Sequence, residues 1–317
     1  MSDQDKERRR GFGFLVLAIL LVLVIFVIVT MWTNSKMPEP LAQKKPDPEV
    51  RGGAFILANQ GLIKQMEENW LPNDMFWPTA LLDNMPSFQI GELEVVRYNV
   101  RVLRDDLSRL RTTDKLDPWA EGAFTALSND PYKWWFPSAE SKWENAYERL
   151  GIFYENLITG KSHFYPRADN LIQLLNEYAS LMGGVNTRLI NAPRRGGEIL
   201  PVNGDTKIGE KETQLIKIDI PWHKIDDNFY YAKGVAYAIH ESFKAIRIDF
   251  IKVLRDKNAV ELTDKIIEDL SRCDFEPWIV FNGSPDSIFA NHSLNLAGVF
   301  NDARQKIYSL SVALSQG

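Results

Sequence analysis

The segment AYAIHESFKAIRIDF, residues 236–250, has the pattern of a helix that is buried on one side. Apolar side chains recur at helical spacing within and around it: Ala232, Val235, Ala236, Ile239, Phe243, Ile246, Phe250 and Val253. A second strip, formed by Gly234, Ala238 and Ala245, has small side chains that let another helix approach closely. We therefore expect this helix to lie between neighbouring helices, in a fold that is mainly α-helical.

His240 and Glu241 match the first half of the helical zinc motif HExxH. Lys244 stands where that motif has its second histidine, and its charge would repel a metal ion. Adjacent helical residues point about 100° apart, so we expect Glu241 to lie on the helix surface without contacting His240. The chain has four histidines, no two of them within five residues, and a single cysteine, Cys273. The sequence therefore predicts no metal site, no cofactor and no intramolecular disulfide.

Four basic side chains are expected along one edge of the same helix: Lys233, His240, Lys244 and Arg247. The simpler interpretation is a boundary between the buried face and solvent. The alternative is a cationic contact edge that meets an acidic partner or an anionic lipid head group.

Helical periodicity extends through most of the remaining chain and predicts about seven or eight helices. The expected ranges are 96–110, 117–127, 138–160, 168–182, 227–255, 260–271 and 291–314. Asp117 and Ser138 are expected as N-caps, and Gly183-Gly184 should end the helix that begins at 168. Isoleucines alternate with polar residues in QLIKIDI, which predicts a small β-hairpin around 198–222.

Residues 11–32, GFGFLVLAILLVLVIFVIVTMW, form a run of 22 residues without a charge. As a helix this run would be roughly 33 Å long, enough to cross the core of a bilayer. It ends in Met31 and Trp32 where a signal peptide would have small residues, so we expect an uncleaved anchor, with a cleaved signal as the alternative. Four basic residues precede it, which predicts that residues 1–10 are cytoplasmic and, in a bacterium, that the body is periplasmic.

Residues 33–48 contain four prolines among charges, so we expect an extended, solvated stalk. Residues 49–317 then form the α-helical domain. A chain of 317 residues that is 45% hydrophobic can bury a large core. The net charge is −5, and an acidic body disfavours binding to nucleic acid.

His223, Asp226 and Asp227 fall where the predicted hairpin meets the next helix. A carboxylate can tune a nearby histidine for proton transfer, which makes these residues a candidate polar binding site. The aspartates also suit the first turn of the helix, where they would satisfy free amide groups and meet the positive end of the helix dipole.

Trp134 and Trp135 belong to an aromatic segment, PYKWWFPSAESKW, residues 131–143. Trp143 continues an apolar helical stripe and is expected in the core. Trp134 and Trp135 are the pair more suited to exposure, where they could stack on a sugar or bury into a partner. Packing within the domain is the alternative.

Four segments carry a resemblance to a known family: LDNMPSFQIGELEVVRYNVRVLRDDLSRLR (82–111), YPRADNLIQLL (165–175), DDNFYYAKGVAYAIHESFKAIRIDF (226–250) and NHSLNLAGVFNDARQKI (291–307). Together they resemble the bacterial membrane-anchored proteins of domain-of-unknown-function family 2333, over nearly the whole chain. The resemblance implies a Gram-negative inner-membrane protein with one N-terminal span and a periplasmic domain.

Two functions remain open on the sequence. The first is a scaffold or accessory subunit of a cell-envelope assembly, which contacts the bilayer through residues 11–32 and other envelope proteins through its domain. The second is a membrane-tethered periplasmic enzyme or ligand-binding module that acts on cell-wall or lipid material. The chain lacks a nucleophile elbow, a P-loop and a dinucleotide glycine motif, which favours the non-enzymatic interpretation.

Overall fold

Helices form most of the chain that the computed structural model describes, which comprises residues 3–42, 46, 50–191, 224–275, 277, 280 and 291–316. These residues contain no β-strand, and the mainly helical prediction is confirmed. The hairpin expected around 198–222 lies outside the described residues.

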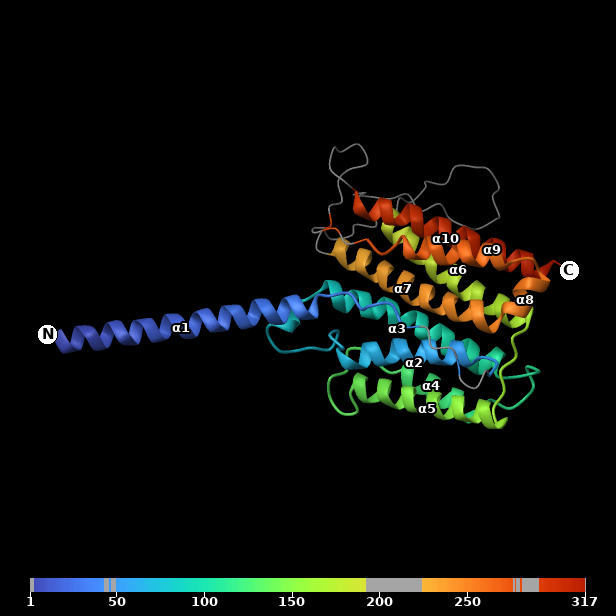
Figure 1. Ribbon diagram of the computed structural model, residues 1–317, viewed down its shortest axis with the longest axis horizontal. Coiled ribbons are helices and arrows are strands. Elements are labelled where there is room, and N and C mark those ends of the chain that lie inside the picture. Colours follow the sequence, from blue (N-terminus) through green and yellow to red (C-terminus); the bar gives the residue numbers. More distant parts are fainter. Residues whose placement is uncertain are drawn as a thin grey trace, which may run out of the picture.

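The first helix, α1 (Asp3–Asn34), projects away from one end of the domain (Figure 1). Its segment Phe12–Asn34 is 23 residues long, apolar and not buried against the rest of the chain. This length and composition suit a membrane span, and a signal sequence near the N-terminus would have the same properties.

The domain contains the following elements in chain order: α2 (Gly53–Glu68), the 3-10 turn η1 (Thr79–Leu81), α3 (Asn84–Val102), the π-helical turn η2 (Leu103–Leu107), α4 (Pro118–Leu127), α5 (Ala139–Thr159), α6 (Ala168–Asn191), α7 (Ile225–Asp249), α8 (Ile251–Asp256), α9 (Val260–Ser271) and α10 (His292–Ser315). Helix α7 is central and packs against α2, α3, α6 and α9. Helix α10 covers α6 and α9, while α4 and α5 lie together on the other side of α2 (Figure 1).

Two glycines allow the close contact between α3 and α7. A Cβ atom at Gly234 would lie 1.9 Å from the carbonyl oxygen of Phe88, and one at Gly91 would lie 2.2 Å from that of Tyr231. Backbone atoms occupy the space that a side chain would need at either position. The strip of small residues predicted on α7 therefore meets α3 at Gly234, while Ala245 of the same strip faces the side of α2.

The predicted starts of α4 and α5 are confirmed. The Asp117 carboxylate accepts hydrogen bonds from the amides of Trp119 (2.9 Å) and Ala120 (3.3 Å). The Ser138 hydroxyl accepts one from the Ser141 amide at 3.4 Å. Helix α5 ends before Gly160, which has a φ of 72° that suits glycine.

The predicted end of α6 is wrong, because the helix continues through Gly183-Gly184 to Asn191. Beyond the glycines its apolar face still packs in the core through Val185 and Leu189. A Cβ atom at Gly183 would lie 3.1 Å from the guanidinium of Arg304, whose Nε donates to the carbonyl oxygen of Ala179. Packing of α10 thus overrides the low helix propensity of the two glycines.

Two other boundaries also differ from prediction. The helix expected over 227–255 is divided at Phe250 into α7 and α8. The apolar stripe from Val96 to Leu110 is buried as far as Leu107, but Leu110 lies beyond the helix and is 51% exposed.

A buried polar cluster joins four helices in the core. The Asn99 side chain on α3 donates to Asn59 Oδ1 on α2 and to Ser242 Oγ on α7, both at 2.8 Å. Its Oδ1 accepts a hydrogen bond from the Tyr178 hydroxyl on α6. These four side chains are all at least 99% buried, so the cluster fixes how the helices align around α7.

Asp249, at the end of α7, caps the start of α2 from a distant part of the chain. Its carboxylate accepts hydrogen bonds from the amides of Gly52 (3.1 Å) and Phe55 (2.7 Å). Burial raises the pKa of Asp249 to about 6, although these amide hydrogen bonds oppose the increase. The folded chain therefore binds a proton here more tightly than the unfolded chain does.

We expect Asp249 to make the free energy of unfolding fall as pH rises. An unfolded aspartate has a pKa of about 3.9, so protonation favours the folded state fully below about pH 4. That contribution, at most about 3 kcal/mol, is lost as pH rises through about 6. The substitution Asp249→Asn should flatten the stability profile between about pH 4 and 6. Thermal unfolding of the native protein and of Asp249→Asn, both full-length and in detergent, measures this as melting temperature against pH. The same dependence on pH in the two proteins would contradict the prediction.

Candidate functional site

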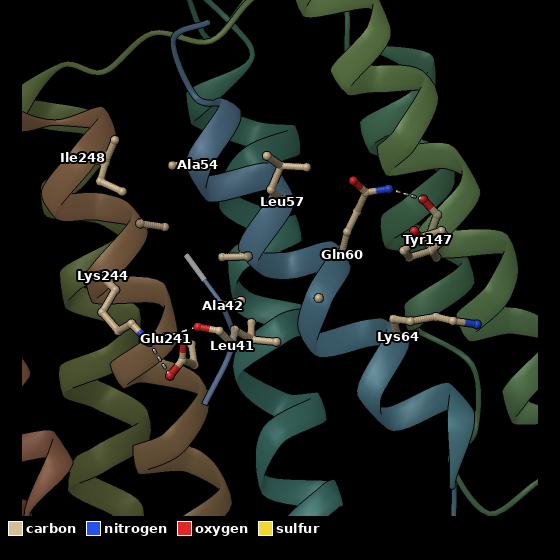
Figure 2. A pocket seen from close by; sticks show the side chains of 13 residues that line it. Leu41, Ala42, Ala54, Leu57, Gln60, Lys64, Tyr147, Glu241, Lys244 and Ile248 are labelled. Atoms are coloured by element: carbon tan, nitrogen blue, oxygen red, sulfur yellow. Dashed lines mark hydrogen bonds and ion pairs between the residues drawn. The ribbon is translucent and has the colours of Figure 1, made fainter. Parts of the chain in front are cut away.

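A cavity of about 260 Å³ lies between α2, α5 and α7 (Figure 2). We call it the α2–α7 cavity, and these residues line it: Leu41, Ala42, Ala54, Leu57, Ala58, Gln60, Gly61, Lys64, Tyr147, Glu241, Lys244, Ala245 and Ile248. Most of its walls are aliphatic, with the polar groups gathered on α7 and at Gln60, Lys64 and Tyr147. The Gln60 amide crosses from α2 to α5 and donates to the Tyr147 carbonyl oxygen at 3.0 Å.

The chain between α1 and α2 forms part of the cavity wall. Leu41 fills the space next to Gly61, where a Cβ atom would lie 3.0 Å from the leucine methyl groups. The Glu39 carbonyl oxygen accepts hydrogen bonds from the Tyr237 hydroxyl at 2.9 Å and the Gln65 amide at 3.0 Å. We call residues 37–42 the docked linker. The solvated stalk expected here is found only in part, because Met37 and Leu41 pack against the core while Glu39, Pro40 and Ala42 are exposed.

Glu241 forms the charged part of the cavity wall. Both of its oxygens contact the Lys244 ammonium, at 2.9 and 2.7 Å, and His240 Nδ1 lies 3.2 Å from Oε1. The side chain is only 2% exposed. Our prediction of a surface carboxylate remote from His240 is therefore wrong. A glutamate side chain is long enough to lie along the surface of its own helix, where the Lys244 ammonium, about one turn further on, pairs with it.

A second buried carboxylate lies near Glu241. Glu92 on α3 is 2% exposed, and its Oε1 has no hydrogen-bond partner among the described residues. Burial raises the pKa of Glu92 well above its ordinary value, and the negative charge of Glu241 adds to the increase. Burial also raises the pKa of Tyr237, and the nearby Glu92 and Glu241 add to that increase. The fold therefore favours the protonated form of Glu92.

This arrangement can bind an apolar group more readily than it can perform chemistry. Aliphatic walls with a few polar groups are typical of small-molecule sites, and this cavity is small for that class. The Glu241–Lys244 ion pair and Lys64 could orient a polar end. No group of three or more histidine, cysteine, aspartate or glutamate side chains suited to a metal ion occurs in the described part of the chain.

The four basic residues expected along one edge of α7 face acids of their own chain. Lys233 has a side chain only 1% exposed, with its Nζ 3.4 Å from Asp274. Arg247 pairs with Asp264 of α9 at 2.7 Å, while Lys244 pairs with Glu241. Residues in or just after α9 thus supply the acidic partners of Arg247 and Lys233, whereas His240 and Lys244 face Glu241 of α7 itself.

Asp226 and Asp227 lie in the first turn of α7, and His223 lies outside the described residues. The helix has no side-chain cap hydrogen bond; the Asp226 carboxylate instead accepts from the Asp227 amide at 3.2 Å. Burial raises the pKa of Asp227, and the nearby carboxylates of Asp226 and Asp83 add to this. The expected position near the helix dipole is found, without the expected capping geometry.

Trp134 and Trp135 are exposed, by 50% and 69%, and their rings pack edge to face with centres 5.3 Å apart. Trp143 is fully buried against Trp70, as expected for a core residue. Neither Trp134 nor Trp135 lines the α2–α7 cavity.

Sequence reasoning missed the α2 side of the cavity and the docked linker. A signal for the linker was present, because Met37 and Leu41 are apolar residues within an otherwise polar, proline-rich segment. Both are partly buried against the core. Apolar side chains in a connecting segment indicate that it packs against a neighbouring surface.

The fold and the cavity define a class of protein: one N-terminal apolar helix joined through a docked linker to a mainly helical domain. The chain belongs to the bacterial family described as an uncharacterized protein conserved in bacteria (DUF2333), which it matches over residues 6–317. This confirms the resemblance found on the sequence. No curated protein and no solved structure matches the chain.

Proposed function

We propose that this protein is a single-pass protein of the bacterial inner membrane, with a cytoplasmic N-terminus and a periplasmic helical domain. In this proposal the domain is a scaffold or accessory subunit of a cell-envelope assembly, anchored by α1. The basic residues before α1 support this orientation.

The observation that carries the proposal is the docked linker. A domain on a solvated linker can turn freely, whereas contacts of Glu39 and Leu41 with α2 and α7 restrict this one relative to its anchor. A fixed orientation matters most for a subunit that must meet neighbours in the same membrane, because it lowers the entropy lost on assembly.

Cross-linked co-purification from cells at native expression tests the scaffold role. A photoreactive residue at Tyr308, which is 61% exposed on α10, should give a discrete adduct with another envelope protein. The substitution Leu41→Ser should weaken this adduct by releasing the linker, and Leu110→Ser, the same change at an exposed position outside the linker, should not. Recovery of the free monomer alone would contradict the proposal. A reporter fused after Gly317 that is active only in the cytoplasm would contradict the orientation.

The α2–α7 cavity favours a second candidate function, which is to bind a lipid-like molecule. Its aliphatic walls suit a hydrocarbon chain, and Lys64 at its margin would meet an anionic end by exchanging its present partner, Glu67, which lies 2.7 Å away. In the structure Leu41 occupies part of this groove, so ligand entry and linker docking would compete for the same space.

Filling the cavity should abolish such binding. The substitution Ala58→Phe places a ring among the lining residues, while Thr125→Phe adds the same ring on an exposed part of α4. We expect Ala58→Phe to lower the affinity of the full-length protein for a dansyl-labelled fatty acid by about tenfold or more, and Thr125→Phe to leave it unchanged. Equal affinities in all three proteins would place the probe elsewhere.

A further inference from the structure

Large apolar side chains are exposed on two loops of the domain. One loop joins α2 to α3, and the other joins α4 to α5. We call the following residues the aromatic platform: Met75 (58% exposed), Phe76 (80%), Trp77 (62%), Leu81 (62%), Tyr132 (60%), Trp134 (50%), Trp135 (69%) and Phe136 (84%). So many exposed aromatic residues on neighbouring loops are unusual for a surface that faces only water.

Hydrogen bonds hold the two loops together as one surface. Trp70 Nε1 donates to the Pro131 carbonyl oxygen at 2.9 Å, and the Asn73 amide donates to that of Lys133 at 3.3 Å. Asn73 also donates to the Glu140 carboxylate at 2.9 Å. Trp70 is 4% exposed and packs against the buried Trp143. The exposed side chains are thus presented by loops that the core holds in place.

The platform lies at the end of the domain from which α1 projects (Figure 1). The turn η1, which contains Leu81, contacts α1 directly. At the end of α1, Lys36 lies over the Trp32 ring, 4.0 Å from its centre. Tryptophan and lysine are typical of the level where a membrane helix leaves the bilayer. The platform therefore lies at the end of the domain where an anchored α1 would emerge.

We propose that the aromatic platform inserts into the interfacial layer of the bilayer that α1 crosses. Tryptophan and tyrosine favour the head-group level, and phenylalanine, methionine and leucine favour the boundary with the acyl chains. The nearby charges of Asp74, Asp130 and Lys133 are mixed in sign, so insertion depends on apolar burial and does not need anionic lipid. This inference rests on α1 being a membrane anchor and holds for either orientation of the chain.

A labelled cysteine can report the depth of each loop in the full-length protein. The native Cys273 is a suitable silent background, because it is 2% exposed and burial raises its pKa to about 12. Phe76→Cys and Phe136→Cys place an NBD label on the platform. Leu110→Cys is the matched control, since Leu110 is an exposed apolar residue beyond the opposite end of α3.

In phosphatidylcholine nanodiscs, the labels at 76 and 136 should emit at shorter wavelength than the label at 110. Lipids with brominated acyl chains should quench them by about twofold or more and leave the control unchanged. Adding anionic lipid should not alter the quenching. Incorporated protein without quenching at 76 and 136, or with equal quenching at all three positions, would overturn the proposal. A chain that did not incorporate into the nanodiscs at all would contradict the anchor as well as the platform. An incorporated chain without quenching at 76 and 136 would contradict only the insertion of the platform.

Replacing other platform residues provides a second test. With Trp77→Ser and Trp135→Ser combined, the label at 136 should lose its quenching while thermal unfolding in detergent stays unchanged, because both side chains are exposed. A blue-shifted label that rises in intensity with the number of chains per disc, without lipid quenching, would assign the surface to protein contacts and overturn the proposal.

Discussion

The substitution Gly234→Ala is expected to destabilise the domain by at least about 3 kcal/mol. The added methyl group would lie 1.9 Å from the carbonyl oxygen of Phe88 and 2.8 Å from its carbonyl carbon. Both are backbone atoms of α3, so the clash can be relieved only by moving the two helices apart. Thermal unfolding of the full-length protein in detergent should show a decrease in melting temperature of about 6 °C or more.

Two other helical glycines provide matched controls for this prediction. No atom lies within 4 Å of the Cβ position at Gly184 on α6 or Gly298 on α10. Replacing either by alanine should stabilise the helix by about 0.5–1 kcal/mol, because alanine loses less backbone entropy on folding. A Gly234→Ala protein as stable as these controls would show that α3 and α7 do not pack as closely as the structure has them.

The core of the fold follows from sequence patterns that act over short distances. The apolar face of 236–250, the caps at Asp117 and Ser138 and the limits of 260–271 all depend on residues within one or two helical turns. The end of α6 could not be predicted in this way, because the contact of Arg304 with α6 near Gly183 and the burial of Val185 and Leu189 arise only from tertiary packing. Tertiary contacts there outweigh the propensity of Gly183-Gly184.

The candidate site was predicted less well than the fold, for the same physical reason. Glu241, Gln60 and Leu41 are far apart in the sequence and meet only when the linker and three helices assemble. The basic residues of α7 lie on one helix as predicted, but the acidic partners of Arg247 and Lys233 are Asp264 and Asp274, in or just after α9. A helical wheel gives the direction of a side chain and contains no information on what covers it.

The docked linker and the turn η1 both connect α1 with the domain. The linker contacts α2 and α7 through Glu39 and Leu41, while η1 contacts α1 itself. Removing either set of contacts should therefore increase the freedom of the domain without unfolding it. Leu41→Ser and the platform variants therefore report how the domain is held relative to α1. Variants in the helix core report the stability of the domain instead.

The substitution Asn99→Leu is expected to destabilise the domain by about 3–5 kcal/mol. Leucine has a similar volume but removes both donors and the acceptor at the centre of the buried cluster. Asn59 Oδ1 and the Tyr178 hydroxyl would then lose the partners that they have in the structure, each at a cost of about 1–3 kcal/mol. The melting temperature of the full-length protein in detergent measures this loss.

A double-mutant cycle with Tyr178→Phe distinguishes a connected cluster from independent contacts. Removing the Tyr178 hydroxyl alone should cost about 1–1.5 kcal/mol, since Asn99 would keep its bonds to Asn59 and Ser242. In the Asn99→Leu background the same change should cost clearly less, because the hydroxyl has already lost its bond to Asn99 and keeps only its contact with Ser242. Additive losses would show that the hydroxyl does not depend on Asn99. The cluster could not then be the feature that aligns α2, α3, α6 and α7.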